Sequence, residues 1–193
     1  MSVSRLSKQS IQSGFPKQQT IWDQTTAVSA MDAISFVIVP SGNSATIEFN
    51  NIPQNYSHLQ LRISGRTAGA YTGDSNTYLY LNNVEAGYSH QLYGSGSGTG
   101  STASASSLVS VRIPNNNNTA DVFGVGIMDI LDYSSSAKTK VVRTFDGWDA
   151  NGSGYIYVHS VLWNATPAVT SIRLTTQDGV WKTDSQISLY GIK

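Results

Sequence analysis

Short runs of alternating apolar and polar residues follow one another from residue 34 to residue 192, separated by Gly, Asn, Ser and Pro. His58–Ser64 is the clearest run: Leu59, Leu61 and Ile63 fall on one side, and polar side chains occupy the other. A period of two is that of a β-strand with one face on a core and the other in water. No stretch carries a sustained helical stripe, so this part of the chain is predicted to be all-β.

The spacing of these runs predicts about ten strands, as in β-sandwiches and barrels. Asp121–Leu131 is more apolar than the others and is expected to lie centrally in a sheet. Gly94–Ser107 contains only small residues and is predicted to be a flexible, exposed loop. Long connections of this kind favour Greek-key crossings, so residues 33–193 are expected to form a two-sheet, jelly-roll-like β-sandwich. The predicted strands are Ala33–Val39, Ser44–Phe49, His58–Ser64, Thr77–Leu81, Tyr88–Tyr93, Leu108–Ile113, Asp121–Leu131, Lys138–Phe145, Tyr155–Trp163, Val169–Thr176 and Gln186–Ile192.

Residues 1–32 have a different character, because they are polar and rich in Gln and Ser. Their apolar residues are widely and irregularly spaced, so the segment cannot bury them on itself. We predict an extended N-terminal arm that attaches the β-domain to a partner. The residues expected to make that contact are Arg5, Leu6, Lys8, Ile11, Phe15, Pro16, Lys17, Ile21 and Trp22.

The composition narrows the range of partners. Charged residues make up only 12% of the chain and the formal net charge is zero, so no electrostatic attraction to nucleic acid or to an anionic membrane is expected. The chain contains no cysteine, which excludes disulfides and thiolate metal sites. The first residues lack the apolar core of a secretory signal, and no apolar run is long enough to span a bilayer.

Candidate catalytic and metal-binding residues are few. His58, His90 and His159 are the only histidines, and none belongs to a recognisable triad motif. Asp146, Asp149 and Asn151 place oxygen ligands near Gly152, which faintly resembles a calcium loop. The closing bidentate Glu is missing, and turn formation explains the same residues, so no cofactor is expected.

Aromatic side chains are the more informative group. Tyr78 and Tyr80 share one face of a strand and Leu79 and Leu81 the other, so one of these pairs is expected to be exposed or at an interface. Exposed rings of this kind serve either as anchors between protein subunits or as platforms that stack on sugars. The alternative is that most of them pack in the core.

Four sequence blocks carry a resemblance to a known class of proteins. They are Gly14-Phe15-Pro16-Lys17 with Trp22-Asp23, the run from Asn51 to Arg62, Ile130-Leu131-Asp132-Tyr133-Ser134-Ser135, and the ending Ser188-Leu189-Tyr190-Gly191-Ile192-Lys193. The chain resembles virion structural proteins of tailed bacteriophages, and in particular those of phages that infect cyanobacteria and other marine bacteria. The blocks follow one another along nearly the whole chain.

This resemblance implies a non-enzymatic component of the phage particle. The leading hypothesis is a capsid decoration, or cement, protein that binds the major capsid protein through its arm. Phe15 and Trp22 would be the main anchors, with Arg5, Lys8 and Lys17 opposite acidic capsid residues. A homotrimer is expected, because threefold positions are natural seats for such proteins. The alternative is a tail-fibre or receptor-binding module that recognises a glycan of the host surface.

Overall fold

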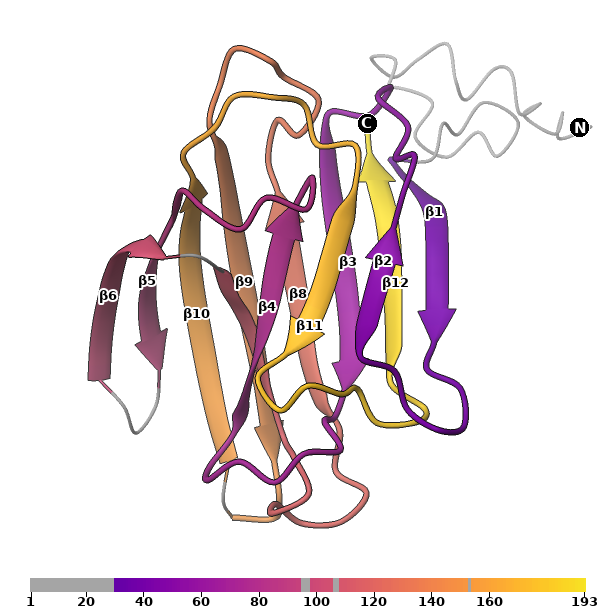
Figure 1. The fold of residues 1–193 in the computed structure, drawn as a ribbon, viewed down its shortest axis with the longest axis vertical. Coiled ribbons are helices and arrows are strands. Elements are labelled where there is room, and N and C mark those ends of the chain that lie inside the picture. Colours follow the sequence, from indigo (N-terminus) through magenta and orange to yellow (C-terminus); the bar gives the residue numbers. More distant parts are fainter. Residues whose placement is uncertain (1–29, 95–97, 106–107, 153) are drawn as a thin grey trace, which may run out of the picture. The chain divides into compact units, whose positions relative to one another are not determined.

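The described part of the chain is built of β-strands alone. The computed structural model describes residues 30–94, 98–105, 108–152 and 154–193, and these ranges contain twelve strands and no helix (Figure 1). Every pairing between neighbouring strands is antiparallel. The strands are β1 (Met31–Ile38), β2 (Thr46–Phe49), β3 (His58–Gly65), β4 (Ser75–Leu81), β5 (Tyr88–Gly94), β6 (Gly98–Ala105), β7 (Leu108–Ile113), β8 (Gly124–Ile130), β9 (Lys140–Asp149), β10 (Gly154–Trp163), β11 (Ile172–Thr176) and β12 (Gln186–Ile192).

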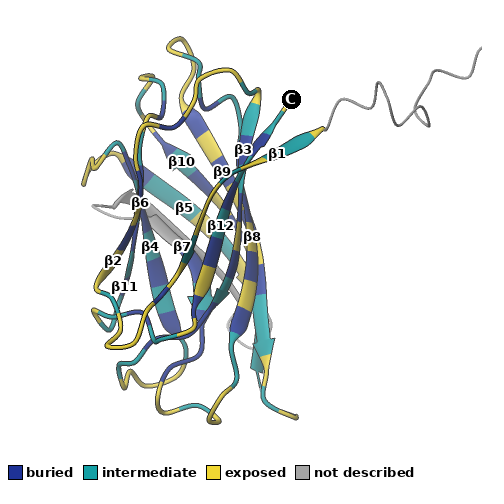
Figure 2. Ribbon diagram, turned by 90° about the vertical axis from the view of Figure 1, so that its right-hand side faces the viewer, coloured by how far each residue is buried: buried dark blue, intermediate teal, exposed yellow. Residues whose placement is uncertain are grey.

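Two sheets of unequal size form the β-domain. The large sheet has eight strands in the order β1-β12-β3-β8-β9-β10-β5-β6, and the small sheet has four in the order β2-β11-β4-β7. Figure 2 shows the two sheets from the side, with the buried positions marked in dark blue along the strands. The prediction of an all-β, two-sheet sandwich is confirmed. Jelly-roll connectivity stays a prediction.

The core lies between the two sheets. Leu59, Leu61 and Ile63 of β3 are buried as the alternation predicts, and Leu79 and Leu81 of β4 meet the same core from the small sheet. Trp163 and Trp181 are among the largest fully buried side chains. Burial on this scale supplies most of the stability that a cysteine-free domain has available.

Three sequence-based expectations need correction. Gly94–Ser107 was expected to be a loop, but Gly98–Ala105 forms β6 and pairs with β5 at the edge of the large sheet. Ladder hydrogen bonds come from the backbone, so small residues can form an edge strand. The strand expected to end at Phe145 continues to Asp149, which places Asp146 inside β9 and not in a turn. Residues 121–123 precede β8 and do not belong to it.

The β-domain spans Met31–Lys193, and its first strand, β1, starts at Met31. The predicted arm contacts, from Arg5 to Trp22, lie outside the described residues. The arm therefore stays a prediction.

Candidate interaction surface

The outer side of the large sheet carries large apolar side chains that face solvent. We call the following group the outer apolar face: Tyr93 of β5, Val125 and Ile127 of β8, Phe145 of β9, and Ile156 and Val158 of β10. Their exposed fractions run from 43% for Ile127 to 67% for Tyr93. Single exposed apolar residues are common, whereas a group on neighbouring strands marks a contact surface.

The strand register makes this group continuous. Tyr93 lies opposite Val158, Val158 opposite Phe145, and Phe145 opposite Ile127, which gives one row across four strands. In the next row Ile156 and Val125 lie on either side of Gly147. Directly opposed side chains of an antiparallel pair are about 5 Å apart, so the first row forms an unbroken apolar strip, whereas Gly147 interrupts the second.

Strand β9 carries polar and apolar residues on both of its faces. Val141 and Phe145 point outward and are exposed, while Thr144 and Asp146 point inward and are buried. Between them Val142 is buried and Arg143 is exposed, as is usual for a sheet with one face in water. The two outward apolar residues are therefore the departure from that pattern.

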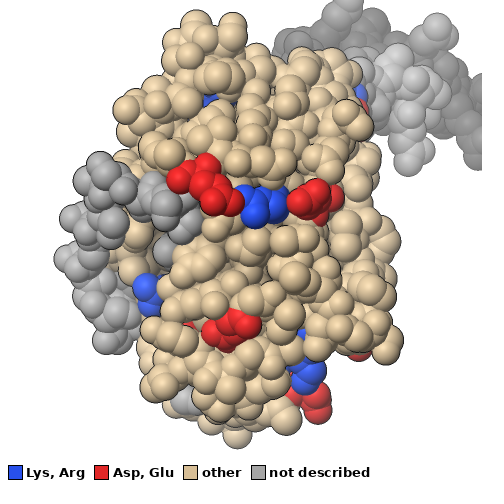
Figure 3. Space-filling view, in the orientation of Figure 1, with Lys and Arg blue, Asp and Glu red and all other residues tan. Residues whose placement is uncertain are grey.

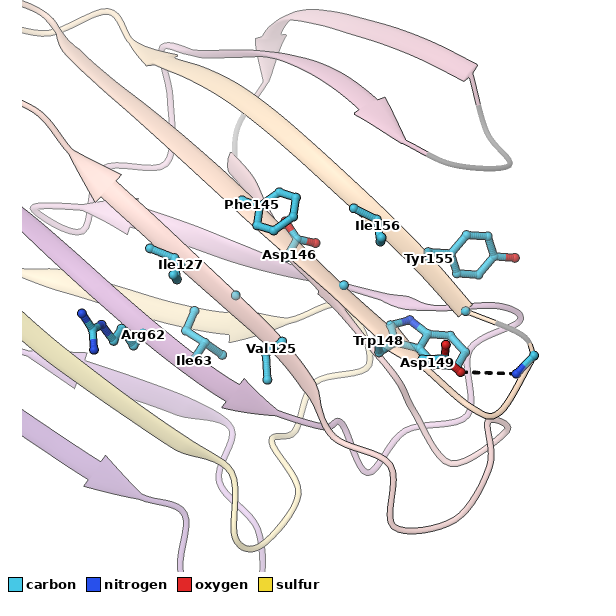
Figure 4. A pocket seen from close by; sticks show the side chains of 14 residues that line it. Arg62, Ile63, Val125, Ile127, Phe145, Asp146, Trp148, Asp149, Tyr155 and Ile156 are labelled. Carbon is cyan, nitrogen blue, oxygen red and sulfur yellow. Dashed lines mark hydrogen bonds between the residues drawn. The ribbon is translucent and has the colours of Figure 1, made fainter.

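A hollow of about 940 Å³ lies at one end of the outer apolar face. Figure 4 shows Val125 and Ile127 on one side of β9, and Tyr155 and Ile156 on the other. Gly147, in the middle, contributes no side chain, and a Cβ at this position would come within 2.6 Å of the Tyr155 carbonyl oxygen. The lining residues are Arg62, Ile63, Val125, Gly126, Ile127, Phe145, Asp146, Gly147, Trp148, Asp149, Gly152, Gly154, Tyr155 and Ile156.

Polar and charged side chains form the border of the outer apolar face. Asp129 and Arg143 lie directly opposite each other in the row beyond Ile127 and Phe145, and Gln60 donates a hydrogen bond to Asp129 at 2.9 Å. At the other end Asp149 accepts hydrogen bonds from the backbone N–H groups of Asn151 (2.6 Å) and Gly152 (3.3 Å; dashed in Figure 4). On the face of the molecule that Figure 3 shows, Lys, Arg, Asp and Glu side chains are also few. The border thus contains both signs of charge.

Behind β9, between the sheets, lies a second polar feature, the buried Asp146–His159 pair. One carboxylate oxygen of Asp146 lies 3.5 Å from Nε2 of His159, and both side chains are fully buried. The backbone N–H of Arg112 donates to Asp146 at 2.8 Å, and the Thr144 hydroxyl donates at 3.2 Å. The Arg112 guanidinium carbon lies 4.4 Å from the ring centroid of Tyr157.

Burial shifts the proton affinities of this pair in opposite directions. Loss of solvation raises the pKa of Asp146 to about 7, although the hydrogen bonds from Arg112 and Thr144 act the other way. Loss of solvation, and then the charge of Arg112, lower the pKa of His159 to about 4. Both shifts favour the uncharged forms. In weakly acidic solution the pair therefore carries one proton, on Asp146.

The pair lacks the geometry of a nucleophile and its base. In a catalytic triad the hydroxyl group bonds to the histidine, whereas Thr144 donates to Asp146. Both side chains are closed off from solvent between the sheets. We therefore interpret the pair as a structural element of the domain interior.

The structure separates the three residues of the calcium hypothesis. Asp146 is buried and points into the domain, while Asp149 is exposed and bonds the turn that contains Asn151. Across the described ranges, no three or more His, Cys, Asp or Glu side chains are grouped so that they could hold a metal ion. Of the other two histidines, His58 accepts a hydrogen bond from the Asp132 backbone N–H at 3.0 Å, and His90 lies half-buried in β5.

The aromatic residues divide between core and surface. Tyr88, Tyr133, Tyr157, Trp163 and Trp181 are buried. Leu79 and Leu81 are buried while Tyr78 and Tyr80 are partly exposed, which resolves the choice that the sequence left open. Trp148 and Tyr155 stay partly exposed beside the hollow, with ring centroids 5.9 Å apart.

Sequence reasoning missed the outer apolar face, although a signal was present. In β8 and β10 apolar residues occupy consecutive positions, as in Ile156-Tyr157-Val158. The apolar run Asp121–Leu131 is expected to lie centrally in a sheet, and β8 is indeed central. The small sheet covers only the inner side, however, so the outward apolar residues of β8, β9 and β10 remain exposed.

Comparison with known proteins gave no relative: no family model, no curated protein and no solved structure matches this chain. Within the described ranges there is also no helix long and apolar enough to cross a membrane.

Proposed function

We propose that this protein is a non-enzymatic structural component of a bacteriophage particle, and most specifically a capsid decoration protein that acts as a homotrimer. The observation that carries the proposal is the outer apolar face, because an exposed apolar surface on a rigid sheet serves association with other proteins. The four sequence blocks that resemble virion proteins supply the particular setting. The low charge of the chain suits a subunit that packs closely with neighbours.

The arm would attach this subunit to the shell. A segment with dispersed apolar anchors can lie across a boundary between capsid subunits and gain affinity by becoming ordered there. Phe15 and Trp22 are the anchors with the largest apolar surface, and Arg5, Lys8 and Lys17 would pair with acidic residues of the major capsid protein.

The test is a binding experiment with undecorated heads of a cyanobacterial phage, imaged by electron cryo-microscopy. Full-length protein is expected to add regular density to the shell. A full-length variant with Phe15→Ala and Trp22→Ala should bind at least about 30-fold more weakly, because buried aromatic anchors dominate such contacts. The matched control, Gln9→Ala with Gln18→Ala, should bind like the unmodified chain. A bare shell with unmodified protein would contradict the proposal, and equal binding by both variants would contradict the role of the anchors.

A second candidate is a receptor-binding module of the tail, in which the same domain recognises a host glycan. The hollow beside Trp148 and Tyr155 favours it, because sugars bind aromatic rings that are flanked by polar groups, and Asp149 and Arg62 line the same hollow. Whole-cell or glycan-array binding by the full chain, abolished by Trp148→Ala, would support this function. Glycan binding that survives this substitution would exclude the hollow as the site.

A further inference from the structure

The outer apolar face lies at the upper end of the size range for a surface that meets only water. A large apolar side chain offers roughly 150–200 Å², so the exposed fractions of its six residues correspond to about 600 Å² of apolar surface. The largest apolar patch of a monomeric protein typically covers about 300–600 Å², and such a patch is often functional. A standard protein interface buries about 800 Å² on each partner, polar border included.

We propose that this face is the surface through which copies of this chain pack against one another. The inference identifies the contact within the homotrimer proposed above, but it does not depend on the phage setting. Two features of the face point to a second copy as the occupant: its charge and its shape.

The charge pattern argues against a highly charged partner. Within β5, β8, β9 and β10 neither apolar row contains a charged residue, and the chain as a whole has no net charge. At the border Arg62 lies opposite Ile127, Arg143 lies opposite Asp129, and Asp149 lines the hollow, so the border has two positive and two negative side chains that largely compensate each other. A second copy can therefore approach without like-charge repulsion, whereas an acidic or basic partner would find no matching field.

The shape supplies both parts of a contact on one surface. Phe145 is 58% exposed and protrudes from β9. Two residues further along the same side of the strand, Gly147 leaves the floor of the hollow without a side chain. The Phe145 ring of one copy can therefore enter the hollow of the next. If two copies meet through this one surface, the contact is self-complementary and twofold; if Phe145 of each copy enters the hollow of the next, the contact is head-to-tail and can close into a ring.

The outward apolar residues of β9 agree with this arrangement. Phe145 and Val141 occupy outward positions that would ordinarily hold polar residues. A second copy that covers the face would remove Phe145 from water, while Arg143 would stay at the border.

The sheet itself provides a matched pair of test positions. Phe36 of β1 is 59% exposed on the same outer side, close to the 58% of Phe145. Phe36 pairs with Ser188 of β12, and β12 and β3 separate it from the outer apolar face. Phe36→Glu and Phe145→Glu therefore introduce the same charge at equal exposure, but only Phe145→Glu places it within the proposed contact.

The experiment is sedimentation equilibrium of the full chain and both variants over a range of concentrations. We expect the full chain and Phe36→Glu to sediment near 62 kDa, three times the 20.7 kDa of one chain. Phe145→Glu should associate at least about 30-fold more weakly, in line with the loss of a central aromatic contact. Circular dichroism of each variant checks that the fold is intact. If Phe145→Glu fails to fold, the cysteine pair described next decides the question.

The absence of cysteine from the chain permits this second measurement. Phe145→Cys and Phe36→Cys, each in the full chain, are labelled with a thiol reagent at low and at high protein concentration. Protection of position 145 alone at high concentration supports the inference. Equal labelling of the two positions at every concentration overturns it.

The remaining outcomes also discriminate. A dimer that Phe145→Glu dissociates would support the face as the contact and would correct only the trimer. A full chain that stays monomeric at high concentration overturns the inference, and so does an oligomer that Phe145→Glu leaves unchanged. If the unmodified chain associates as expected but leaves the phage shell bare, that result would count against the proposed function alone.

Discussion

The buried Asp146–His159 pair leads to a prediction about how stability depends on pH. Between about pH 4 and pH 6.5 the folded pair holds one proton, on Asp146, because its pKa is about 7 and that of His159 is about 4. The unfolded chain also holds one proton over this range, but on the histidine, whose ordinary pKa is 6.5. Stability changes with pH only where the two states bind different numbers of protons. The pair should therefore add almost no pH dependence in this window.

Removing either partner should make the pKa shift of the other measurable as a change of stability with pH. In Asp146→Asn the unfolded chain gains a proton on the histidine as pH falls from 6.5 to 4, whereas the folded chain does not. Stability relative to the unmodified protein should then fall by about 3 kcal/mol between pH 7 and pH 4, since one pKa unit corresponds to about 1.4 kcal/mol. In His159→Gln the folded chain keeps the Asp146 proton that the unfolded chain loses. Its relative stability should fall by about 3 kcal/mol as pH rises from 4 to 7.

The assay is urea unfolding followed by the fluorescence of the four tryptophans, at half-unit steps from pH 4 to pH 7. The Asn side chain keeps an oxygen acceptor for the Arg112 backbone N–H, so the fold should survive the substitution. Asp184→Asn, at an exposed position, is the control for loss of a carboxylate as such. Opposite slopes for the two variants are the expected result. Profiles for both variants that run parallel to the unmodified protein would refute the proton assignment.

Three further substitutions test the packing of the domain. Leu61→Ala should lower the free energy of unfolding by about 3 kcal/mol, because it opens a cavity at a fully buried position. Urea unfolding measures this change, and a loss below about 1 kcal/mol would contradict that packing. Arg66→Met should lower the free energy of unfolding by about 2–4 kcal/mol, because the Arg66 guanidinium donates hydrogen bonds to the carbonyl oxygens of residues 115, 118, 119 and 122. Urea unfolding and amide hydrogen exchange measure the effect. Unchanged stability, with fast amide exchange in residues 115–122, would exclude this role. Gly191→Ala should lower the melting temperature by several degrees, because its Cβ would come within 2.4 Å of the Tyr56 ring; an unchanged melting temperature would show that the ring moves aside.

Much of the fold could be predicted from local patterns. The period-two alternation of Leu59, Leu61 and Ile63 predicts both a strand and its buried face, and the structure confirms both. For Thr77–Leu81 the alternation predicts the strand, whereas only the structure decides that Leu79 and Leu81 are buried and Tyr78 and Tyr80 partly exposed. Gly98–Ala105 could not be predicted as a strand, because its small residues carry no pattern of apolar and polar positions. Backbone pairing with β5 makes it one.

The candidate site could not be predicted in the same way. Asp146 looks like a turn residue in the sequence, and only the length of β9 and the position of the small sheet turn it toward His159 in the interior. The outer apolar face joins residues of β5, β8, β9 and β10 that are up to about 65 positions apart in the chain, so its rows exist only through the strand register.

The sequence by itself determined that this chain forms an all-β domain with a cysteine-free apolar core, because alternation and turn residues act over a few neighbouring positions. Only the tertiary structure decided which apolar side chains are covered. The eight-stranded sheet has two faces and the four-stranded sheet packs against one of them, so the other presents Phe145 and its neighbours to solvent.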